Sequence, residues 1–570
     1  MRRGRGTGVS LVAVVLTVGW LAAACSGTPA EQAGTGGGPA PSGDAATGPP
    51  DREAPTVGAP RPGGSLIVGL AAETDSFNPY SGQWSSSSYL AANAFFDPLM
   101  AVDEKGIAKP YLAESIAATG DFRSWTITLR PGVTFHDGTE LDAAALKKHL
   151  DAARTSGLTS QAFTPVQSVD VDGPLAVKVT MSKPWATFPA TLSMQSGYVA
   201  APAMIDDPAG ANAKPIGTGP FVFVERVRDA SLKTKKNPGY WRKDAEGTPL
   251  PYLDAVEFRI LADASSRGNA LAAGDINAMD VLTPDSYRQQ ADAARRDAVQ
   301  MITNTGSETD ETVVAMNTTK EPFDDLLARQ ALQAAVDQDK ISAQAYQSAF
   351  PGTWGMFEKG SPYYISREEA GYPAPDLTRA KDLVARYEQQ HGKKLEFTVL
   401  IPPDPQYLAI AQAVQAEVKE AGITANLQAI EQTQLIRNVV VTGDYQAAGF
   451  LLRGAPSPDQ SYIFLATKAN ATGISLNFTR HDDPEVTAAM DDFRAAGDPQ
   501  QRVEAIATVQ RRLAAEVPMV FLVNNRVGFV ASNVVHGLRA TTFPGTEVPA
   551  AAPYPVTPFF TSAWKDQATG

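Results

Sequence analysis

Cys25 is the one side chain whose type and setting point to covalent chemistry. It is the only cysteine among 570 residues, and it directly follows the small residues Ala22-Ala23-Ala24. Three arginines (Arg2, Arg3, Arg5) precede an apolar run over residues 9–24. A basic start, a short apolar run and small residues before a cut are the layout of a secretory signal peptide. Such a peptide does not require a cysteine at the cut, so the thiol needs an explanation of its own.

This stretch resembles the lipobox of bacterial lipoproteins, in which the cysteine is lipidated and becomes the mature N-terminus. Lipoboxes usually carry Leu three positions before the cysteine, whereas here Ala22 stands there and Leu21 precedes it. The alternatives are a transmembrane anchor and an ordinary buried cysteine. A spanning helix needs about 20 apolar residues, more than this run supplies, and no basic stop-transfer cluster follows. The residues flanking Arg2-Arg3 do not support a twin-arginine export signal. We therefore expect a signal peptide over 1–24.

The usual signatures of catalysis and metal binding do not occur in the sequence. It has no Gly-x-Ser-x-Gly elbow, His-Glu-x-x-His pair, phosphate-binding loop or dinucleotide fingerprint. His136 and Asp137 invite interpretation as a dyad, but a turn at Asp137-Gly138 between a strand and a helix explains them better. The histidines show no metal-ligand spacing. We therefore expect no catalytic residue, no metal site and no cofactor.

Length, charge and composition limit the class of protein. A chain of this length is too long for one hydrophobic core and suits two or three domains. The formal net charge of −13 argues against nucleic acid as a partner. A single cysteine allows no internal disulfide, so the core alone must hold an exported fold. Residues 26–64 are dominated by Gly, Ala, Pro, Ser and Thr and predict a flexible tether after the lipidated Cys25.

Apolar patterning predicts the elements that must position any site. Residues 65–70 form a short apolar run typical of a buried strand, and 124–129 alternate as a half-buried strand does. Alternation over 395–401, a helix from about Gln406 to Gly422 and renewed alternation over 423–429 describe one βαβ unit. The fold class is therefore α/β with a parallel sheet in the second half. Ligands of such sheets bind beyond the carboxyl ends of the strands, which points to 402–406 and 453–459.

Five stretches, in order along the chain, carry a resemblance to a known family. They are 134–143 (TFHDGTELDA), 215–221 (PIGTGPF), 236–241 (KNPGYW), 270–277 (ALAAGDIN) and the set Asn317, 322–325, 329–332 and 335–337. Together they are similar to the family 5 extracytoplasmic solute-binding proteins, the peptide- and nickel-type receptors of ABC importers. Each stretch also has a structural reading as a turn, a core contact or a helix start. We take them as markers of the fold and not as ligand contacts.

The resemblance implies a two-lobed clamp like the periplasmic binding proteins, of type II, with a subdomain inserted in the first lobe. We expect lobe I with its insert over 65–308, lobe II over 309–520 and a return segment over 521–570 that completes lobe I. Ligand would lie between the lobes and stabilise the closed form.

Candidate ligand contacts come from the resemblance and from the strand-end rule. The resemblance places the segment 73–80 beside the cleft, with Trp84 just beyond it, and Trp354 lies in a further loop. The strand-end rule adds 453–459. The candidate residues are Glu73, Asp75, Tyr80, Trp84, Trp354, Arg453 and Asp459. Packing is the alternative for each aromatic residue.

The loop 449–459 (GFLLRGAPSPD) departs from the pattern of the peptide-binding members. These usually carry "G-W-x-A-D-Y-x-D-P", whose first Asp holds the peptide α-amino group. Here Gly454 or Ala455 stands at that position and Arg453 has appeared, so Arg453 is expected to pair with a carboxylate or a phosphate. Asp459 substitutes for the missing Asp only if the loop shifts.

The resemblance implies a lipid-anchored, extracytoplasmic binding subunit of an ABC importer, on the outer face of the cell membrane. Its partners would be a small, peptide-like solute and the membrane permease, and a monomer is expected. Three alternatives stay open: a clamp for a non-peptide solute (sugar, metal chelate or anionic metabolite), a sensory lipoprotein, and an exported hydrolase.

Overall fold

The computed structural model describes residues 51–55, 58–82, 84–103, 105–156, 159–160, 162–303, 310–452, 457–468, 475–551 and 556–566. The expected signal peptide, Cys25, most of the expected tether and Arg453 lie outside these residues. Within them, none of the helices is both long and apolar enough to cross a membrane.

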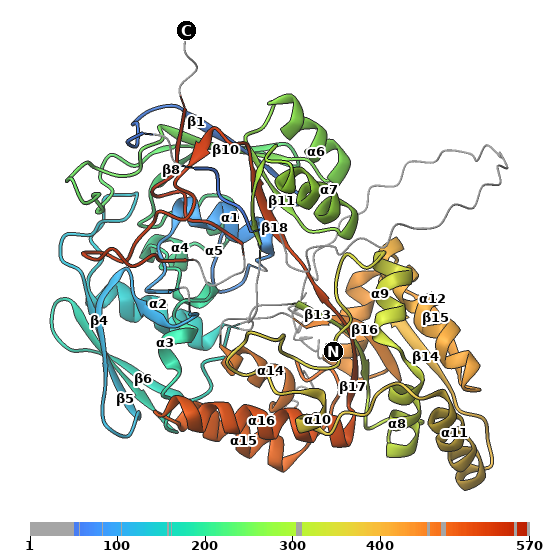
Figure 1. The fold of residues 1–570 in the computed structure, drawn as a ribbon. Coiled ribbons are helices and arrows are strands. Elements are labelled where there is room, and N and C mark those ends of the chain that lie inside the picture. Colours follow the sequence, from blue (N-terminus) through green and yellow to red (C-terminus); the bar gives the residue numbers. More distant parts are fainter. Residues whose placement is uncertain are drawn as a thin grey trace, which may run out of the picture.

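A seven-stranded mixed sheet forms the centre of the first body (Figure 1). Its strand order is β12-β18-β11-β1-β10-β9-β8, and β1 pairs in parallel with both β10 and β11. The predicted strand over 65–70 is thus confirmed as a buried central strand. The strands are β1 (Ser65–Leu70), β8 (Phe221–Val227), β9 (Ser231–Lys236), β10 (Ala255–Ile260), β11 (Ala278–Val281), β12 (Gln300–Thr303) and β18 (Gly528–Ala531).

A second, four-stranded antiparallel sheet is inserted between β1 and β8. Its order is β4-β5-β7-β6, and the helix α2 packs on it. The strands are β4 (Ala113–Ala118), β5 (Ser124–Leu129), β6 (Val166–Val171) and β7 (Ala176–Met181). Two further sheets have two short strands each. In one, β2 (Met100–Val102) pairs with β3 (Ala108–Pro110), and in the other β19 (Val535–His536) pairs with β20 (Trp564–Lys565).

Helices of the first body follow their capping signals. The helix predicted to start near Asp142 is α2, and the Asp142 carboxylate accepts a bond from the Ala145 amide at 2.8 Å. The predicted turn after His136 is confirmed, because Gly138 adopts φ 85° and its amide bonds the Phe135 carbonyl. The helices are α1 (Ser86–Phe95), α2 (Ala143–Thr155), α3 (Phe188–Thr191), α4 (Pro202–Asp206), α5 (Pro208–Ala211), α6 (Ala264–Ala273) and α7 (Pro284–Arg295), with a 3₁₀ turn at Gln195–Gly197.

The second body is built on a five-stranded sheet of order β15-β14-β16-β13-β17. The predicted βαβ unit is confirmed, since β14 and β15 pair in parallel over six residues and α12 connects them. The strands are β13 (Asp310–Met316), β14 (Glu396–Ile401), β15 (Thr424–Ala429), β16 (Ala447–Leu452) and β17 (Met519–Asn525). The helices are α8 (Leu326–Ala335), α9 (Gln338–Tyr346), α10 (Arg367–Ala370), α11 (Leu377–His391), α12 (Pro405–Glu420), α13 (Gln432–Ile436), α14 (Tyr462–Leu465), α15 (Pro484–Ala495) and α16 (Pro499–Glu516), with a π-helical turn at Arg437–Thr442 and a 3₁₀ turn at Pro458–Ser461.

The chain passes between the two bodies twice, at neighbouring positions. Outward the chain leaves β12, which pairs with β18, and enters β13, which pairs with β17. It returns from β17 to β18 (Figure 1). Because β17 pairs with β13 as far as Asn525, the return lies at 526–527. The expected boundary after residue 520 therefore falls inside β17. The predicted α/β fold of two bodies with an insert in the first is confirmed.

Two of the sequence motifs meet at the buried carboxylate of Asp97, and a third joins them at the Gly219 carbonyl. It accepts hydrogen bonds from the Thr218 hydroxyl, the Tyr240 hydroxyl and Nε1 of Trp241, each at 2.9 Å. The Gly219 carbonyl accepts from His136 Nε2 and from the side-chain amide of Asn237 at 2.9 and 3.0 Å. The motifs are thus internal supports of the first body, as the structural reading of each predicted.

The described part of the expected tether is bound to the first body. Arg52 and Met301 on β12 exchange two backbone hydrogen bonds of 2.9 and 2.8 Å. The Arg52 guanidinium also reaches Asp297 at 2.7 Å and the Val299 carbonyl at 2.8 Å. Residues 51–55 therefore depart from the flexible tether expected over 26–64, because Arg52 offers donors that the surrounding Gly, Ala and Pro lack.

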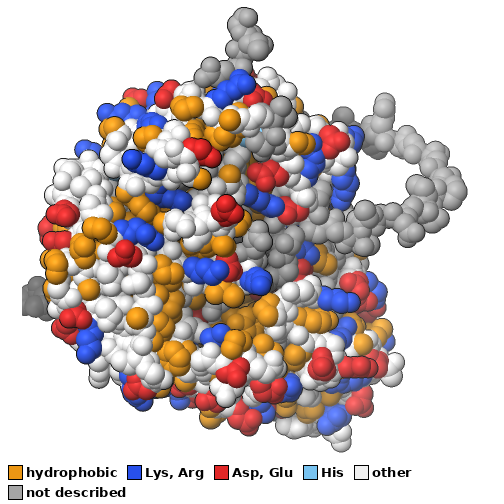
Figure 2. All heavy atoms as spheres, turned by 60° about the vertical axis from the view of Figure 1, so that its left-hand side comes forward, with side chains coloured by type: hydrophobic (Ala, Val, Ile, Leu, Met, Phe, Trp, Pro, Cys, Tyr) orange, Lys and Arg blue, Asp and Glu red, His pale blue; other side chains and the backbone are white. Residues whose placement is uncertain are grey.

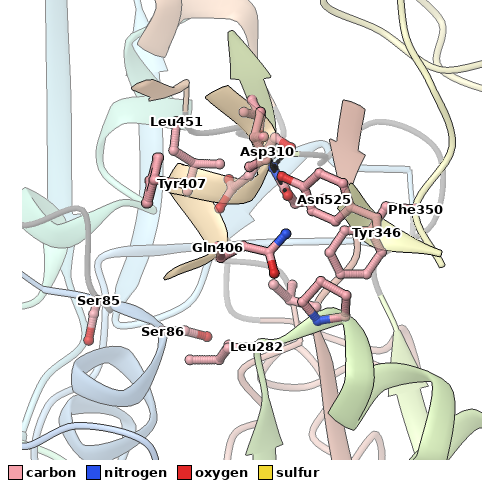
Figure 3. A pocket seen from close by; sticks show the side chains of 14 residues that line it. Ser85, Ser86, Leu282, Asp310, Tyr346, Phe350, Gln406, Tyr407, Leu451 and Asn525 are labelled. Atoms are coloured by element: carbon pink, nitrogen blue, oxygen red, sulfur yellow. Dashed lines mark hydrogen bonds between the residues drawn. The ribbon is translucent and has the colours of Figure 1, made fainter. Parts of the chain in front are cut away.

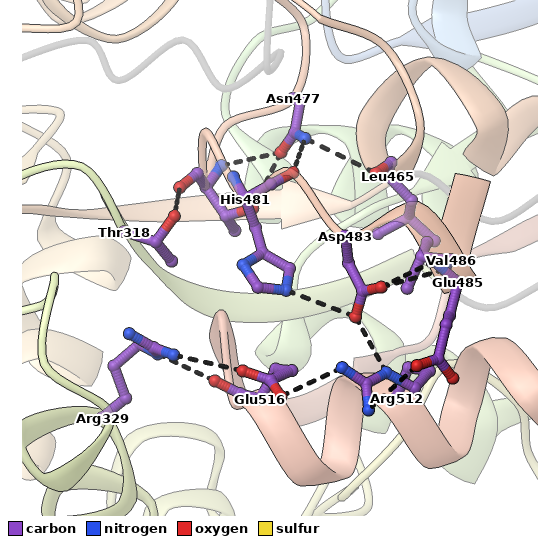
Figure 4. A network of polar contacts seen from close by, with 11 residues as sticks. Thr318, Arg329, Leu465, Asn477, His481, Asp483, Glu485, Val486, Arg512 and Glu516 are labelled. Atoms are coloured by element: carbon purple, nitrogen blue, oxygen red, sulfur yellow. Dashed lines mark hydrogen bonds and ion pairs between the residues drawn. The ribbon is translucent and has the colours of Figure 1, made fainter.

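A polar network joins α8, α15 and α16 in the second body (Figure 4). Arg512 on α16 contacts the buried carboxylate of Asp483 at 2.9 Å and Glu516 at 3.0 Å. Arg329 on α8 donates to the carbonyls of Phe323 and Glu516, both at 2.8 Å. In the fifth motif, the sequence suggested Asp324 as the helix-start acid and an ion pair with Arg329. The residue that caps α8 is its neighbour Asp325, which accepts from the Leu327 amide at 2.8 Å, and Arg329 fastens the helix through the two carbonyls.

Candidate ligand-binding site

A pocket lies between the two bodies, beside the paired chain crossings (Figure 3). It is partly open to solvent. The first body contributes Ser85, Ser86, Leu282 and Pro284, and the second contributes Tyr346, Phe350, Gln406, Tyr407, Ile410 and Leu451, with Asp310, Thr312, Asn525 and Val527 at the crossings. A space-filling view shows hydrophobic side chains gathered along a furrow between the bodies (Figure 2). A space lined from both bodies is the arrangement expected of a clamp.

Three helices begin at this pocket. Ser85 caps α1, Thr283 caps α7, and Asp404 caps α12 with bonds to the amides of Gln406 and Tyr407 at 2.8 and 3.2 Å. The caps take up amides that would otherwise attract an anion, and proline supplies no amide at the start of α7 and α12. The capped amides are thus occupied, and polar side chains line the pocket beside them.

The polar side of the pocket is a connected set of groups. The Asn525 side-chain amide donates to the Thr312 hydroxyl and to the Asp310 carbonyl, both at 2.9 Å. Thr312 and Tyr346 share a hydroxyl contact of 3.1 Å. Burial raises the pKa of Tyr346, so its phenol stays protonated and serves as a hydrogen-bond donor. This set fixes side-chain positions before any ligand arrives.

The apolar side continues beneath α12 into a second, small hollow. Thr312, Tyr407 and Ile410 line both spaces. The inner hollow is otherwise walled mainly by aliphatic and aromatic side chains of β14, β15 and α12. The site as a whole therefore suits a solute with both a polar and an apolar portion.

The predicted contacts in 73–80 are placed as follows. Glu73 pairs with Arg226 of β8 at 2.7 Å, within the first body. Asp75 is exposed. Tyr80 is buried, and its hydroxyl contacts His149 Nδ1 at 2.6 Å. Thus the segment contains one charge paired inside the body, one exposed charge and one buried phenol.

The two predicted tryptophans pack in separate bodies. Trp84 is buried, donates from Nε1 to the Ser76 carbonyl at 3.0 Å and meets Tyr89 and Tyr198 edge-on. Trp354 is half-buried in the second body, where Tyr364 and Tyr372 lie 6.3 and 6.0 Å from its ring. The structure does not bring the two rings together.

Asp459 is held entirely by protein groups. Its Oδ1 contacts two guanidinium nitrogens of Arg494 at 2.8 and 2.6 Å, and its Oδ2 accepts from Trp185 Nε1 at 2.7 Å and from the Thr187 hydroxyl. With both oxygens used, it is not available in this conformation to hold a ligand amine. Arg453 lies outside the described residues, and none of the other six candidates lines the pocket.

The pocket residues were only partly visible in the sequence. The strand-end rule pointed to 402–406, and Gln406 does line the pocket. Ser85 and Ser86 stand in a run of four serines that could have marked a helix start. Asp310 and Asn525 carry no local signal, because their placement depends on the pairing of β13 with β17. Among the described residues no cluster of His, Cys, Asp and Glu could hold a metal ion.

Comparison with known proteins identifies the family. Residues 108–473 match the sequence model of the bacterial extracellular solute-binding proteins, family 5. The chain belongs to this family. A family 5 protein binds solutes for an ABC importer and is not an enzyme, and membership confirms an extracytoplasmic location.

Relatives and solved structures extend over most of this family 5 chain. A probable di/tripeptide-binding protein of Pseudomonas aeruginosa is 26% identical over 512 residues, covering 84% of this chain and 94% of the relative. The glutathione-binding protein GsiB of Pectobacterium atrosepticum is 24% identical over 475 residues, covering 81% and 88%. The agropinic acid complex of AgaA from A. tumefaciens R10 superposes with a TM-score of 0.74 at 23% identity, covering 88% and 99%. The structural likeness confirms the two-bodied fold.

Proposed function

We propose that this protein is the lipid-anchored binding component of an ABC importer and captures peptides or peptide-like solutes between its two bodies. The observation that carries the proposal is the pocket lined from both bodies at the crossings. The named peptide and glutathione specificities of the relatives support this class of solute. We assign the two bodies to the two expected lobes, with crossings after Thr303 and Asn525. The closed form would present the solute to the permease, with the protein acting as a monomer.

A non-peptide solute is the second candidate, and one observation favours it. Both oxygens of Asp459 are engaged within the protein, so this residue offers no anchor for a peptide α-amine in the observed conformation. The structural neighbour AgaA is described in complex with agropinic acid. An acidic, non-peptide solute should therefore be tested for binding alongside peptides.

Isothermal titration with glutathione, trialanine and agropinic acid would test solute capture. Gln406→Trp should fill the pocket and weaken binding of an active ligand at least tenfold. Gln412→Trp is the matched control, because Gln412 is exposed on the same helix and should leave the affinity unchanged. Equal affinities of the two variants would contradict the placement of the site. Failure of all three solutes to bind would contradict the proposed solute classes.

The lipid anchor is a separate part of the proposal. Two acyl chains on Cys25 would hold the protein stably at the membrane, whereas a single chain would not. Cys25→Ser should release the protein to the medium without changing ligand affinity. The control Ser26→Ala should leave the protein at the membrane and its ligand affinity unchanged. Retention of the Cys25→Ser protein in the membrane fraction would contradict the anchor. Loss of binding in that variant would contradict the separation of anchor from clamp.

A further inference from the structure

The two bodies touch at a place separate from the chain crossings. A loop of the first body, 182–187 between β7 and α3, lies against the 3₁₀ turn Pro458–Ser461 and against α15 of the second body. Trp185 and Asp459 are both buried there, and they are 274 positions apart in sequence. A pocket at the crossings and a contact away from them together define how far the bodies are closed.

Polar bonds, and not only packing, make this contact. Trp185 Nε1 and the Thr187 hydroxyl donate to Asp459, and the Ala186 amide donates to the Arg494 carbonyl at 2.5 Å. Hydrogen bonds to a charged acceptor are about twice as strong as bonds between neutral groups. At the edge of the contact, Lys183 pairs with Asp491 at 2.7 Å, and both side chains are more exposed than those of Asp459 and Arg494. The central bonds therefore dominate the contact.

Each body keeps its half of the contact ordered. Trp185 packs against Phe163 and Phe188 of the first body. Arg494 lies over the Tyr462 ring at 3.7 Å and stays paired with Asp459, and all three belong to the second body. If the bodies separate, the Asp459–Arg494 pair remains intact and the Trp185 and Thr187 donors turn to water. No buried charge is left without a partner, so the contact can break and re-form at modest cost.

We propose that Trp185, Thr187, Asp459 and Arg494 form a latch that holds the clamp closed without a solute. The latch rests on the proposed closure of the two bodies, but it acts on the ligand-free protein. A population already closed lowers the free energy that a solute must supply to complete closure. Affinity would thus be set partly by residues that never touch the solute.

Ligand-free protein tests the latch by solution X-ray scattering and hydrogen exchange. Thr187→Val keeps the shape of the side chain and removes its donor, and Trp185→Phe removes the indole donor. Each variant should raise the radius of gyration, and in each the Ala186 amide should exchange about tenfold faster or more, because a bond to a charged acceptor contributes more than a tenfold factor. Thr234→Val is the control, since its hydroxyl bonds the Val256 carbonyl inside the first body.

Two results would overturn the latch. A wild-type, ligand-free radius of gyration larger than that of the closed structure would mean that the contact does not hold the bodies together. Faster exchange at Ala186 with an unchanged radius of gyration in both variants would mean that breaking the contact does not open the clamp, because the inserted subdomain moves together with the second body. Neither measurement uses a solute, so failure here is distinct from failure of the proposed transport function.

Discussion

Tyr80 and His149 form a buried pair in which the tyrosine hydroxyl donates to Nδ1 of the imidazole at 2.6 Å. On the other side of the ring, Nε2 donates to the Ser196 carbonyl at 2.9 Å. This pattern requires the neutral tautomer with hydrogen on Nε2. Tyr80 was a candidate ligand contact, and the structure gives its hydroxyl a partner within the first body. The pair joins the loop after β1 to α2 of the inserted subdomain.

His149 is expected to make stability depend on pH. Burial lowers its pKa from 6.5 to about 4. The unfolded chain takes up the proton first, so stability is present above pH 6.5 and is lost as pH falls through 4. The loss amounts to about 3 kcal/mol at 1.36 kcal/mol per pKa unit. Because Asp97 also titrates in this range, the two proteins must be compared: in urea unfolding, the stability of the wild type relative to His149→Gln should fall by this amount from pH 7 to pH 4. Equal slopes would contradict the prediction.

Asp97 is expected to act in the opposite direction over nearly the same pH range. Burial raises its pKa from 3.8 to about 6, against the lowering effect of its three hydrogen bonds. A raised pKa gives stability that is present below pH 3.8 and lost as pH rises through 6. The wild type should lose about 3 kcal/mol relative to Asp97→Asn between pH 4 and 7. A difference that does not vary with pH would show that the carboxylate titrates normally.

Gly219 is expected to tolerate no side chain. A Cβ there would lie 2.4 Å from the Phe95 carbonyl carbon and 2.6 Å from the Phe96 amide. Both are backbone atoms that cannot turn aside, so Gly219→Ala should cost more than about 3 kcal/mol or prevent folding. Gly120→Ala is the control, because nothing lies within 4 Å of its Cβ position. Thermal unfolding would compare them, and similar melting temperatures would contradict the close approach.

Arg512 and its neighbour Arg511 allow a direct comparison of a partly buried and an exposed ion pair. Arg512 bonds the Asp483 carboxylate, whose side chain is 4% exposed, while Arg511 bonds Glu504, which is 66% exposed. Arg512→Ala should cost about 1–3 kcal/mol because Asp483 loses a partner in a buried setting. Arg511→Ala should change stability by less than about 0.5 kcal/mol. Chemical denaturation measures both, and equal effects would refute the ranking.

Arg52 is expected to hold residues 51–55 on β12. Arg52→Ala removes the bonds to Asp297 and Val299, so the Met301 amide, which donates to the Arg52 carbonyl, should exchange several-fold faster. Because Asp297 is exposed, loss of this ion pair should lower the free energy of unfolding by no more than about 1 kcal/mol. Arg61→Ala is the control, since Arg61 is exposed. Unchanged exchange at Met301 would show that the backbone bonds alone hold the segment.

Much of the fold was predictable from the sequence because the signals that define it are local. Alternation marked β5, and the carboxylate of Asp142 marked the start of α2. The run from β14 through α12 to β15 marked a parallel strand pair, although the sheet as a whole is mixed because β13 pairs antiparallel with β16 and β17. The motifs identified the family before their contacts were known. The candidate ligand contacts were less predictable, because a side chain's type does not reveal which distant group it meets.

The sequence by itself determined the elements, the family and the presence of a two-bodied clamp. Only the tertiary structure decided which polar groups face the cleft and which are engaged elsewhere. Asp459 looked like a ligand anchor in its own loop, but Trp185, Thr187 and Arg494 take both of its oxygens. Asp310 and Asn525 reach the pocket because β13 and β17 pair at the crossings. Contacts between residues hundreds of positions apart are fixed by the packing of whole elements, and no local pattern records them.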